Sequence, residues 1–412
     1  MSITLRPYQI EISSRAAEQL NDNKFVYLSM EVRCGKTLTA LSCLDNFLLD
    51  RVLFVTKKKA ISSIESDFKA LQPSYSLLVT NYDQLHNIKE KFDAIVIDEA
   101  HSLGSFPKPA LRAREAKRVI ELSNDPYVIF LSGTPSPESY SQMFHQMWIL
   151  GRRSPFSRYI NFYRWANDYV KVWQRVINGN RINVYDNGLK DKIMGDLSKH
   201  MISFTQSEAG FTTSVSETVL HVKMSDQTYN MCDKLKRDLL LEGKGDVILA
   251  DTPVKLMQKL HQMYSGSVIL ESGNRLIFDT AKAEFIKERF KGKRIAVFYK
   301  FQAELDCLLS VFQEDMTTDL EKFHAGACNN FAIQIVTGRE GISLKQADYL
   351  VYYNIDFSAT SYWQSRDRLT TMDRLKNDVF WIFAEGGIED KIYKVVQSKK
   401  NFTISHFKKD FL

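Results

Sequence analysis

The sequence has few cysteines, and none of them form close pairs. Its five cysteines are scattered, and no Cys-x-x-Cys spacing occurs. This excludes the usual zinc-site patterns and a disulfide framework, and it predicts a protein of a reducing compartment. No nuclease or chromatin-reading module is recognisable either.

Long apolar runs and low-complexity stretches are also missing. No apolar run is long enough to span a membrane, and the first residues lack the charged-then-apolar pattern of a secretory signal. We therefore expect a soluble protein in the cytoplasm of a bacterial cell or a phage-infected host, with the nucleus as the alternative. The net charge of +6 is compatible with a polyanionic partner without requiring one.

A phosphate-binding loop is indicated near the N-terminus by Cys34-Gly35-Lys36-Thr37, which follows an apolar run and opens an amphipathic segment. A tight turn between a strand and a helix places backbone N–H groups around an anion. Gly35 lets the backbone approach phosphate, Lys36 supplies a positive charge, and Thr37 offers a hydroxyl to Mg²⁺. Met30 stands where the general pattern has a further glycine, so an ordinary helix start is the alternative.

A second site supports the first. Residues 92–101 form an apolar run that ends in two adjacent carboxylates. Asp98 is suited to hold Mg²⁺, and Glu99 is suited to orient a water molecule. Together the two sites predict the hydrolysis of a nucleoside triphosphate.

The segment ahead of the phosphate loop offers a site for the base of the nucleotide. The amide of Gln9 can read an adenine edge while Tyr8 or Arg6 lies against the ring. A polar helix start is the alternative, and the position of the segment ahead of Lys36 favours the nucleotide.

Several polar side chains near predicted strand ends are candidates for contacts with a nucleic-acid backbone. For each of them the alternative is a solvated charged face. Aromatic residues interleaved with arginine between 156 and 175 can stack on bases, but their helical spacing favours core packing. The candidates are Lys57, Lys58, Asn81, Arg112, which we expect in a basic loop, and Arg339.

The fold class is α/β. Strands and helices alternate from residue 25 to 150 and again from 276, which predicts two parallel sheets with ligands at the carboxyl ends of the strands. A mainly helical insertion separates them. We therefore expect a first lobe over 1–152, an insertion and linker over 153–270, and a second lobe over 271–412.

In this order the segments resemble superfamily 2 helicases and translocases, and within them the Swi/Snf-type DNA translocases, over nearly the whole chain. The resemblance implies two RecA-like lobes that use ATP and Mg²⁺ and act as a monomer on DNA. It rests on Arg6-Pro7-Tyr8-Gln9, on Cys34-Gly35-Lys36-Thr37, on the DEAH box Asp98-Glu99-Ala100-His101, on Ser132-Gly133-Thr134-Pro135, on 341–348 and on 383–392.

The resemblance also implies roles for single residues. Lys36 binds phosphate, Thr37 and Asp98 hold Mg²⁺, and Glu99 activates water. His101 and Thr134 couple the site to DNA contacts. The second lobe contributes Gln364 and Arg368 as catalytic groups, and Glu340, Gly341 and Arg374 to nucleotide binding.

Two departures from the family pattern stand out. Arg33, which we place in the nucleotide-binding loop with Cys34, occupies a position where the family usually has glycine. The position of the usual arginine finger is Thr371, so Arg366 or Arg374 is the nearest substitute.

The leading hypothesis is an ATP-dependent DNA translocase that prefers duplex DNA, and its economy of length resembles stand-alone phage or bacterial members. The alternatives are a strand-separating helicase on branched DNA or RNA, and an ATP-gated DNA clamp with little turnover. Other replication, recombination or transcription proteins are possible partners.

Overall fold

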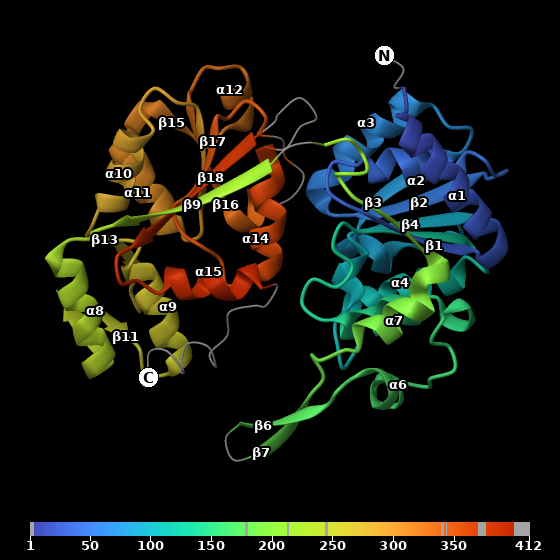
Figure 1. The fold of residues 1–412 in the computed structure, drawn as a ribbon, viewed down its shortest axis with the longest axis horizontal. Helices are drawn as coiled ribbons and strands as arrows, with labels where there is room; N and C mark the ends of the chain where they lie inside the picture. The colour runs from blue at the N-terminus through green and yellow to red at the C-terminus, as the bar shows by residue number, and fades with distance from the viewer. Residues whose placement is uncertain are drawn as a thin grey trace. The chain divides into compact units, whose positions relative to one another are not determined.

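A six-stranded parallel sheet forms the centre of each half of the chain (Figure 1). The computed structural model divides into two units, Met1–Phe211 and Thr212–Leu412. It describes residues 4–177, 180–211, 214–243, 246–338, 342, 344–369 and 376–398, without the side chains at 177, 243, 364 and 367.

In the first unit the strand order is β3-β2-β4-β5-β1-β8, and every neighbouring pair is parallel. The strands are β1 Phe25–Met30, β2 Arg51–Thr56, β3 Ser76–Asn81, β4 Ala94–Asp98, β5 Tyr127–Leu131 and β8 Met201–Phe204.

The strands of this sheet are apolar throughout because both faces of the sheet are covered. Along β1, Phe25 and Tyr27 belong to one buried cluster, whereas Val26 and Leu28 belong to another on the opposite face. The first cluster draws on α4 to α7, and the second on α1 to α3. The helices are α1 Pro7–Asn23, α2 Lys36–Leu44, α3 Ile61–Leu71, α4 Leu111–Leu122, α5 Met143–Trp148, α6 Phe162–Tyr169 and α7 Lys190–Leu197.

In the second unit the strand order is β15-β16-β14-β17-β18-β9, again parallel throughout. The strands are β9 Ser214–Val222, β14 Ile295–Tyr299, β15 Met316–Thr317, β16 Asn330–Gln334, β17 Tyr349–Tyr352 and β18 Lys376–Ala384.

The helices of the second unit pack on this sheet around one buried cluster that contains residues from α8 to α11 and α15. They are α8 Asp226–Asp238, α9 Pro253–Met263, α10 Ala281–Arg289, α11 Gln302–Phe312, α12 Leu320–His324, α13 Ile335–Gly338, α14 Ala359–Arg366 and α15 Glu389–Gln397. Among the described helices, none has both the length and the apolar character needed to cross a bilayer.

The predicted α/β class with two parallel sheets is confirmed. The stretch 153–270 contains the expected helices but also hairpins, and it contributes β8 to the first sheet and β9 to the second. The two units part inside this stretch, between Phe211 and Thr212, so the three-part division stays a prediction. The hairpins are β6 Trp173–Ile177 with β7 Asn180–Val184, β10 Leu240–Gly243 with β11 Asp246–Leu249, and β12 Ser267–Ile269 with β13 Arg275–Ile277.

The prediction of a basic loop after the carboxylate strand is wrong from residue 111 onward. The chain turns into α4 at Leu111, so Arg112 lies on a helix. The helix forms because its apolar residues, among them Ala116 and Val119, are spaced to face the sheet and are buried there.

Candidate nucleotide-binding site

The predicted phosphate loop connects β1 to α2 in the first unit. Gly35 precedes the helix with φ of 77°, and Lys36 is its first residue. The Lys36 Nζ donates hydrogen bonds to the carbonyl oxygens of Met30 (3.1 Å) and Glu31 (3.3 Å), so the ammonium group is folded over the loop. Arg33 adopts φ of 65°, the left-handed conformation that glycine takes without strain. The turn therefore keeps this conformation with arginine in place of the family's glycine.

Gln9 lies against this loop from α1. Its side chain is buried; Oε1 accepts from the Arg6 N–H at 2.8 Å, and Nε2 donates to the Gly35 carbonyl at 3.4 Å. The neighbouring Tyr8 stacks on Phe204, with ring centroids 4.8 Å apart. The predicted adenine segment and the phosphate loop are thus brought into contact.

Gly35→Ala is expected to lower both stability and nucleotide affinity. A Cβ at this position would lie 2.0 Å from the Gln9 Nε2, and the positive φ alone costs about 1–2 kcal/mol with a side chain. A loop shifted by the clash would no longer hold its backbone N–H groups around phosphate, so we also expect weaker binding of an ATP analogue. Thermal unfolding and a binding titration measure the two effects.

The control is Gly35→Ala combined with Gln9→Ala, which removes the clash but keeps the backbone strain. It should recover part of the lost stability relative to Gly35→Ala, with Gln9→Ala alone as the reference. Wild-type stability and affinity in Gly35→Ala would contradict the tight packing of the loop on Gln9.

Asp98 ends β4 in a half-buried position next to the loop. One carboxylate oxygen accepts from the Thr56 hydroxyl at 2.8 Å and the other from the Glu99 N–H at 3.0 Å, while Tyr82 donates its hydroxyl to the Asp98 carbonyl. Burial, and next the negative charge of Glu99, raises the pKa of Asp98 from 3.8 to about 6, although Thr56 and Lys36 oppose this shift. A metal cation that binds this carboxylate below about pH 6 would therefore have to displace the proton of Asp98.

This raised pKa predicts a pH-dependent stability in metal-free buffer. Between pH 3.8 and about 6 the folded protein holds a proton on Asp98 that the unfolded chain has released, so stability contributed by this group falls as the pH rises through this window. Asp98→Asn cannot titrate. The melting temperature of Asp98→Asn minus that of the wild type should therefore increase from pH 4 to pH 6 and then level off. A difference that stays constant over this range would contradict the assignment.

A chain of polar contacts links the carboxylates to the loop after β5. The Glu99 Oε2 lies 3.2 Å from the His101 Nδ1, and this nitrogen lies 3.1 Å from the Ser132 hydroxyl oxygen. The same Ser132 oxygen accepts from the Thr134 N–H at 3.1 Å. The structure thus brings Glu99, His101 and Thr134 together, and Ser132 is the connecting residue that the sequence reading quoted only as part of a motif.

The loop after β5 also packs on the phosphate loop. A Cβ at Gly133 would lie 3.4 Å from the Met30 carbonyl oxygen and 3.7 Å from the Lys36 Nζ. On α5, Gln146 donates to the Pro135 carbonyl at 2.8 Å and accepts from the buried Tyr27 hydroxyl at 2.9 Å. Neither Gln146 nor Tyr27 carries a sequence signal that could have identified it.

The residues at this edge of the first sheet fit a magnesium nucleotide. The ammonium of Lys36, the hydroxyl of Thr37 and the carboxylate of Asp98 are the groups that phosphates and Mg²⁺ require. The buried Thr134 hydroxyl oxygen has no hydrogen-bond partner in the described part of the chain. When bound, the magnesium nucleotide would supply the phosphoryl group, and Glu99 is the carboxylate placed to take a proton from water.

Only some of the site residues expected in the second unit are among the described residues. Arg339, Glu340, Gly341 and Arg374 lie outside the described residues, and so does the side chain of Gln364. The backbone carbonyl of Arg368 accepts a hydrogen bond from the Leu344 N–H at 3.3 Å.

Arg366, one of the two substitutes for the arginine finger, is engaged inside the second unit. Its Nη1 donates to the Glu217 Oε1 at 2.7 Å, and its guanidinium lies 4.1 Å from the Trp363 ring centroid. Glu217 also accepts from the Tyr362 hydroxyl at 2.8 Å and the Trp381 Nε1 at 2.9 Å. These contacts hold Arg366 on β9.

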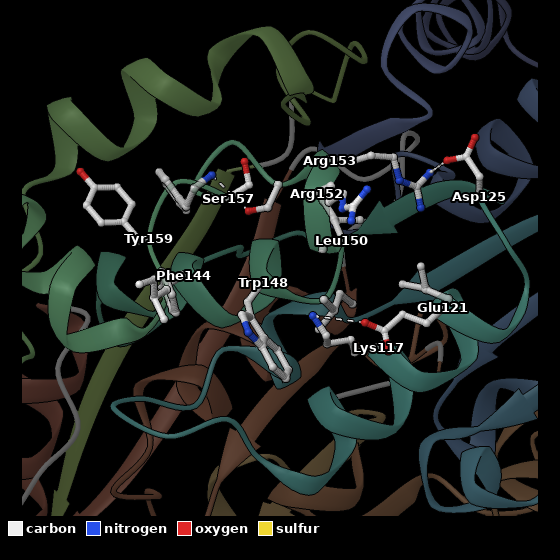
Figure 2. Close-up of a pocket in the computed structure, with 16 residues that line it drawn as sticks. Lys117, Glu121, Asp125, Phe144, Trp148, Leu150, Arg152, Arg153, Ser157 and Tyr159 are labelled. Carbon is white, nitrogen blue, oxygen red and sulfur yellow. Dashed lines mark hydrogen bonds and ion pairs between the residues drawn. The ribbon is translucent and has the colours of Figure 1, made fainter.

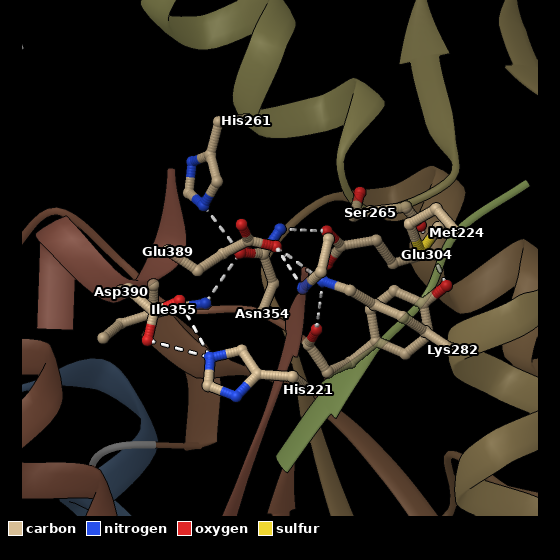
Figure 3. A network of polar contacts seen from close by, with 12 residues as sticks. His221, Met224, His261, Ser265, Lys282, Glu304, Asn354, Ile355, Glu389 and Asp390 are labelled. Carbon is tan, nitrogen blue, oxygen red and sulfur yellow. Dashed lines mark hydrogen bonds and ion pairs between the residues drawn. The ribbon is translucent and has the colours of Figure 1, made fainter. Parts of the chain in front are cut away.

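The carboxyl edge of the second sheet carries a buried polar network that the sequence reading missed (Figure 3). Lys282 and Glu389, both fully buried, form an ion pair of 2.6 Å. Beside them Asn354 donates to Glu304 at 2.5 Å and lies 2.6 Å from the His261 Nε2. Burial lowers the pKa of His261 well below its usual value, so this ring is neutral. The network connects α9, α10, α11 and α15 at the strand ends.

Two of the nucleic-acid candidates lie close together in the first unit. Arg112 donates to the Asp83 carboxylate at 3.1 Å, and the Asn81 side chain accepts from the Asp83 N–H at 3.0 Å. Lys58 is exposed and Lys57 half-buried at the end of β2. Their contact with nucleic acid stays a prediction.

A separate pocket of about 580 Å³ lies in the first unit, away from these residues (Figure 2). Arg153, one of its lining residues, donates to the carbonyls of Lys24 and Pro126, which precede β1 and β5. The pocket is therefore at the amino edge of the sheet, whereas ligands of parallel sheets bind at the carboxyl edge. We assign the nucleotide to the carboxyl edge.

Two family models match the chain. The model described as type III restriction enzyme, res subunit, matches residues 2–137, and the helicase conserved C-terminal domain matches residues 256–370. Among curated proteins none matches. Solved structures of a Sulfolobus solfataricus SWI2/SNF2 ATPase core match at 16% identity. The one in complex with dsDNA has a TM-score of 0.44, covering 99% of this chain and 93% of the other, and the core domain alone has a TM-score of 0.45, covering 97% and 89%.

The two family models match in chain order and between them cover more than half of the residues. These matches support the prediction, made from the sequence motifs, of a superfamily 2 helicase/translocase. The protein is a nucleic-acid-dependent ATPase.

Proposed function

We propose that the protein is a Swi/Snf-type translocase that hydrolyses ATP with Mg²⁺ and moves along duplex DNA, remodelling the DNA or displacing proteins bound to it. Lys36 binds phosphate, Thr37 and Asp98 hold the metal ion, and Glu99 activates water. In the second unit Gln364 and Arg368 complete the catalytic set, with Arg374 in place of the missing finger.

The observation that carries this proposal is the chain of contacts from Glu99 through His101 and Ser132 to Thr134. It joins the water-activating carboxylate to the loop after β5, so a change of charge or position at Glu99 acts directly on that loop. Such a connection is what a motor needs to turn hydrolysis into movement of the elements that contact DNA. A simple phosphotransferase does not require a connection between its catalytic carboxylate and a distant loop.

An ATP-gated DNA clamp with little turnover is the second candidate. The contact of Arg366 with Glu217 favours the clamp, because an arginine paired with this carboxylate does not act as the arginine finger. An arginine finger contributes about 10³- to 10⁵-fold to the rate in related phosphoryl-transfer systems. A helicase on branched DNA or RNA differs from the leading proposal in its substrate and in separating the strands.

Steady-state ATP hydrolysis without polynucleotide, with single-stranded DNA, with duplex DNA and with RNA tests the proposal. We expect duplex DNA to stimulate most, and the stimulation to fade as salt rises because phosphate contacts release counterions. Displacement of a triplex strand from duplex DNA then tests movement.

The other outcomes identify the alternatives. Stronger stimulation by single strands or RNA would replace the translocase with the helicase. Tight binding of ATP and DNA with little hydrolysis would favour the clamp.

A further inference from the structure

The β6–β7 hairpin extends away from the body of the first unit (Figure 1). It is a two-stranded antiparallel sheet whose strands pair only with each other. Three large apolar side chains on it are exposed, Trp173 by 45%, Val176 by 64% and Ile182 by 46%, and none of the three belongs to a core cluster of the described residues. An isolated hairpin of this kind is marginally stable in water, so its persistence needs an explanation.

The base of the hairpin is firmly held. The Lys171 N–H donates to the Asn187 carbonyl at 2.9 Å, and the Trp173 Nε1 donates to the Asp186 carboxylate at 2.8 Å. Ser139 and Ser141 donate their hydroxyls to the backbone carbonyls of Asp186 (2.7 Å) and Tyr185 (2.5 Å). These serines follow shortly after the loop 132–135 of the nucleotide site. The hairpin therefore has a fixed direction relative to that loop.

Each face of the hairpin carries one arginine, and Trp173 lies on the same face as Arg175. In the register of the strands Arg175 lies opposite Ile182, and Arg181 lies opposite Val176. Each face thus presents one arginine beside an aliphatic side chain. Neither arginine has an ion-pair partner within the described part of the chain, and the stretch 171–185 contains three basic residues and no acidic one.

The exposed Arg181, the half-buried Arg175, exposed amides and an aromatic ring lie on one projecting element, and these groups match a strand of nucleic acid. Arginines bind phosphates, and the Trp173 ring, which donates its Nε1–H to Asp186, can stack on a base. Stacking requires a base that is not already stacked within a duplex. A protein partner that adds a strand to the hairpin edge would need backbone groups but no excess of positive charge.

We propose that the β6–β7 hairpin is an arm that binds unpaired bases of a nucleic-acid strand together with their phosphates. This proposal rests on the proposed function of the nucleotide site. It specifies that the first unit contacts nucleic acid with unpaired bases. For a motor on duplex DNA, such bases occur where the duplex opens or forks.

The test compares binding of a fluorescently labelled forked DNA and of a blunt duplex of equal length, by anisotropy, without nucleotide. In Arg175→Gln/Arg181→Gln the slope of log affinity against log salt should decrease by about 1.4 on the fork, which is two single-strand phosphate contacts. Trp173→Ala should bind the fork about tenfold more weakly, and Trp173→Phe should restore binding.

Two readouts serve as controls. Lys89→Gln/Lys91→Gln removes two exposed lysines of the same unit and should bind both DNAs like the wild type. Hydrolysis of ATP without nucleic acid should be unchanged in every variant, since none of these residues contacts the nucleotide site.

The outcomes separate this proposal from the function of the whole protein. Wild-type binding and salt slope in the hairpin variants would overturn the hairpin proposal alone. An equal loss on the fork and on the blunt duplex would overturn the assignment to unpaired bases. A wild-type protein that binds no nucleic acid would overturn the proposed function and the hairpin proposal with it.

Discussion

Glu99→Gln is expected to slow ATP hydrolysis by about 10²- to 10⁴-fold, the contribution of a positioned general base, while ATP binding stays nearly unchanged. Glu99 follows directly after β4, beside the carboxylate of Asp98 that we propose to hold the metal ion, and its oxygen lies 3.2 Å from His101. Glutamine keeps the shape and the contact but accepts a proton far less readily. Single-turnover hydrolysis and binding of an ATP analogue measure the two quantities separately.

Two variants frame this result. Glu65→Gln changes an exposed glutamate on α3 and should hydrolyse ATP like the wild type. Lys36→Ala removes the phosphate-binding charge and should reduce hydrolysis as well, but with weaker nucleotide binding. Turnover in Glu99→Gln at more than half the wild-type rate would remove Glu99 from the catalytic site.

Lys282→Met is expected to lower the free energy of unfolding by about 3–5 kcal/mol, because it leaves the carboxylate of Glu389 buried without its charge partner. Both side chains are fully buried, and the ion pair is 2.6 Å long. The Lys282 ammonium also donates to the Tyr353 carbonyl at 3.4 Å. Urea denaturation followed by circular dichroism measures the loss.

The double variant Lys282→Met/Glu389→Leu removes both charges and should recover most of this loss. Lys255→Met, which breaks the exposed pair with Asp251, is the matched control in the same unit and should cost no more than about 1 kcal/mol. A loss of less than 1 kcal/mol in Lys282→Met would contradict the description of this pair as an interior charge pair.

The local elements of this protein follow from its sequence. The strands at 51–56 and 295–299 and the helix at 302–312 are each a continuous apolar or amphipathic segment between polar turns, in line with the predicted alternation of strands and helices. For the same reason the phosphate loop and Asp98 were found in advance. Parallel strands bring their carboxyl ends to one edge, so residues that follow different strands meet there.

The partners of these residues depended on the tertiary structure. Gln146 bonds to Tyr27 across 119 residues, Lys282 to Glu389 across 107, and Arg366 to Glu217 across 149. Such contacts depend on the order of the strands in the sheet, and the periodicity of a segment carries no information about that order. The projecting β6–β7 hairpin was missed for a related reason: the aromatic and arginine pattern around it was read with helical spacing.

The sequence by itself indicated the class of the protein and predicted the residues of a nucleotide site, because phosphate, metal ion and water require particular groups at short spacings in the chain. The tertiary structure alone decided which of the other charged residues are free to act. It placed Arg366 on Glu217 and buried Lys282 with Glu389, whereas it left Arg181 exposed and Arg175 half-buried on the hairpin. The availability of a charge depends on what folds against it, and this is a property of the whole sheet and its neighbours.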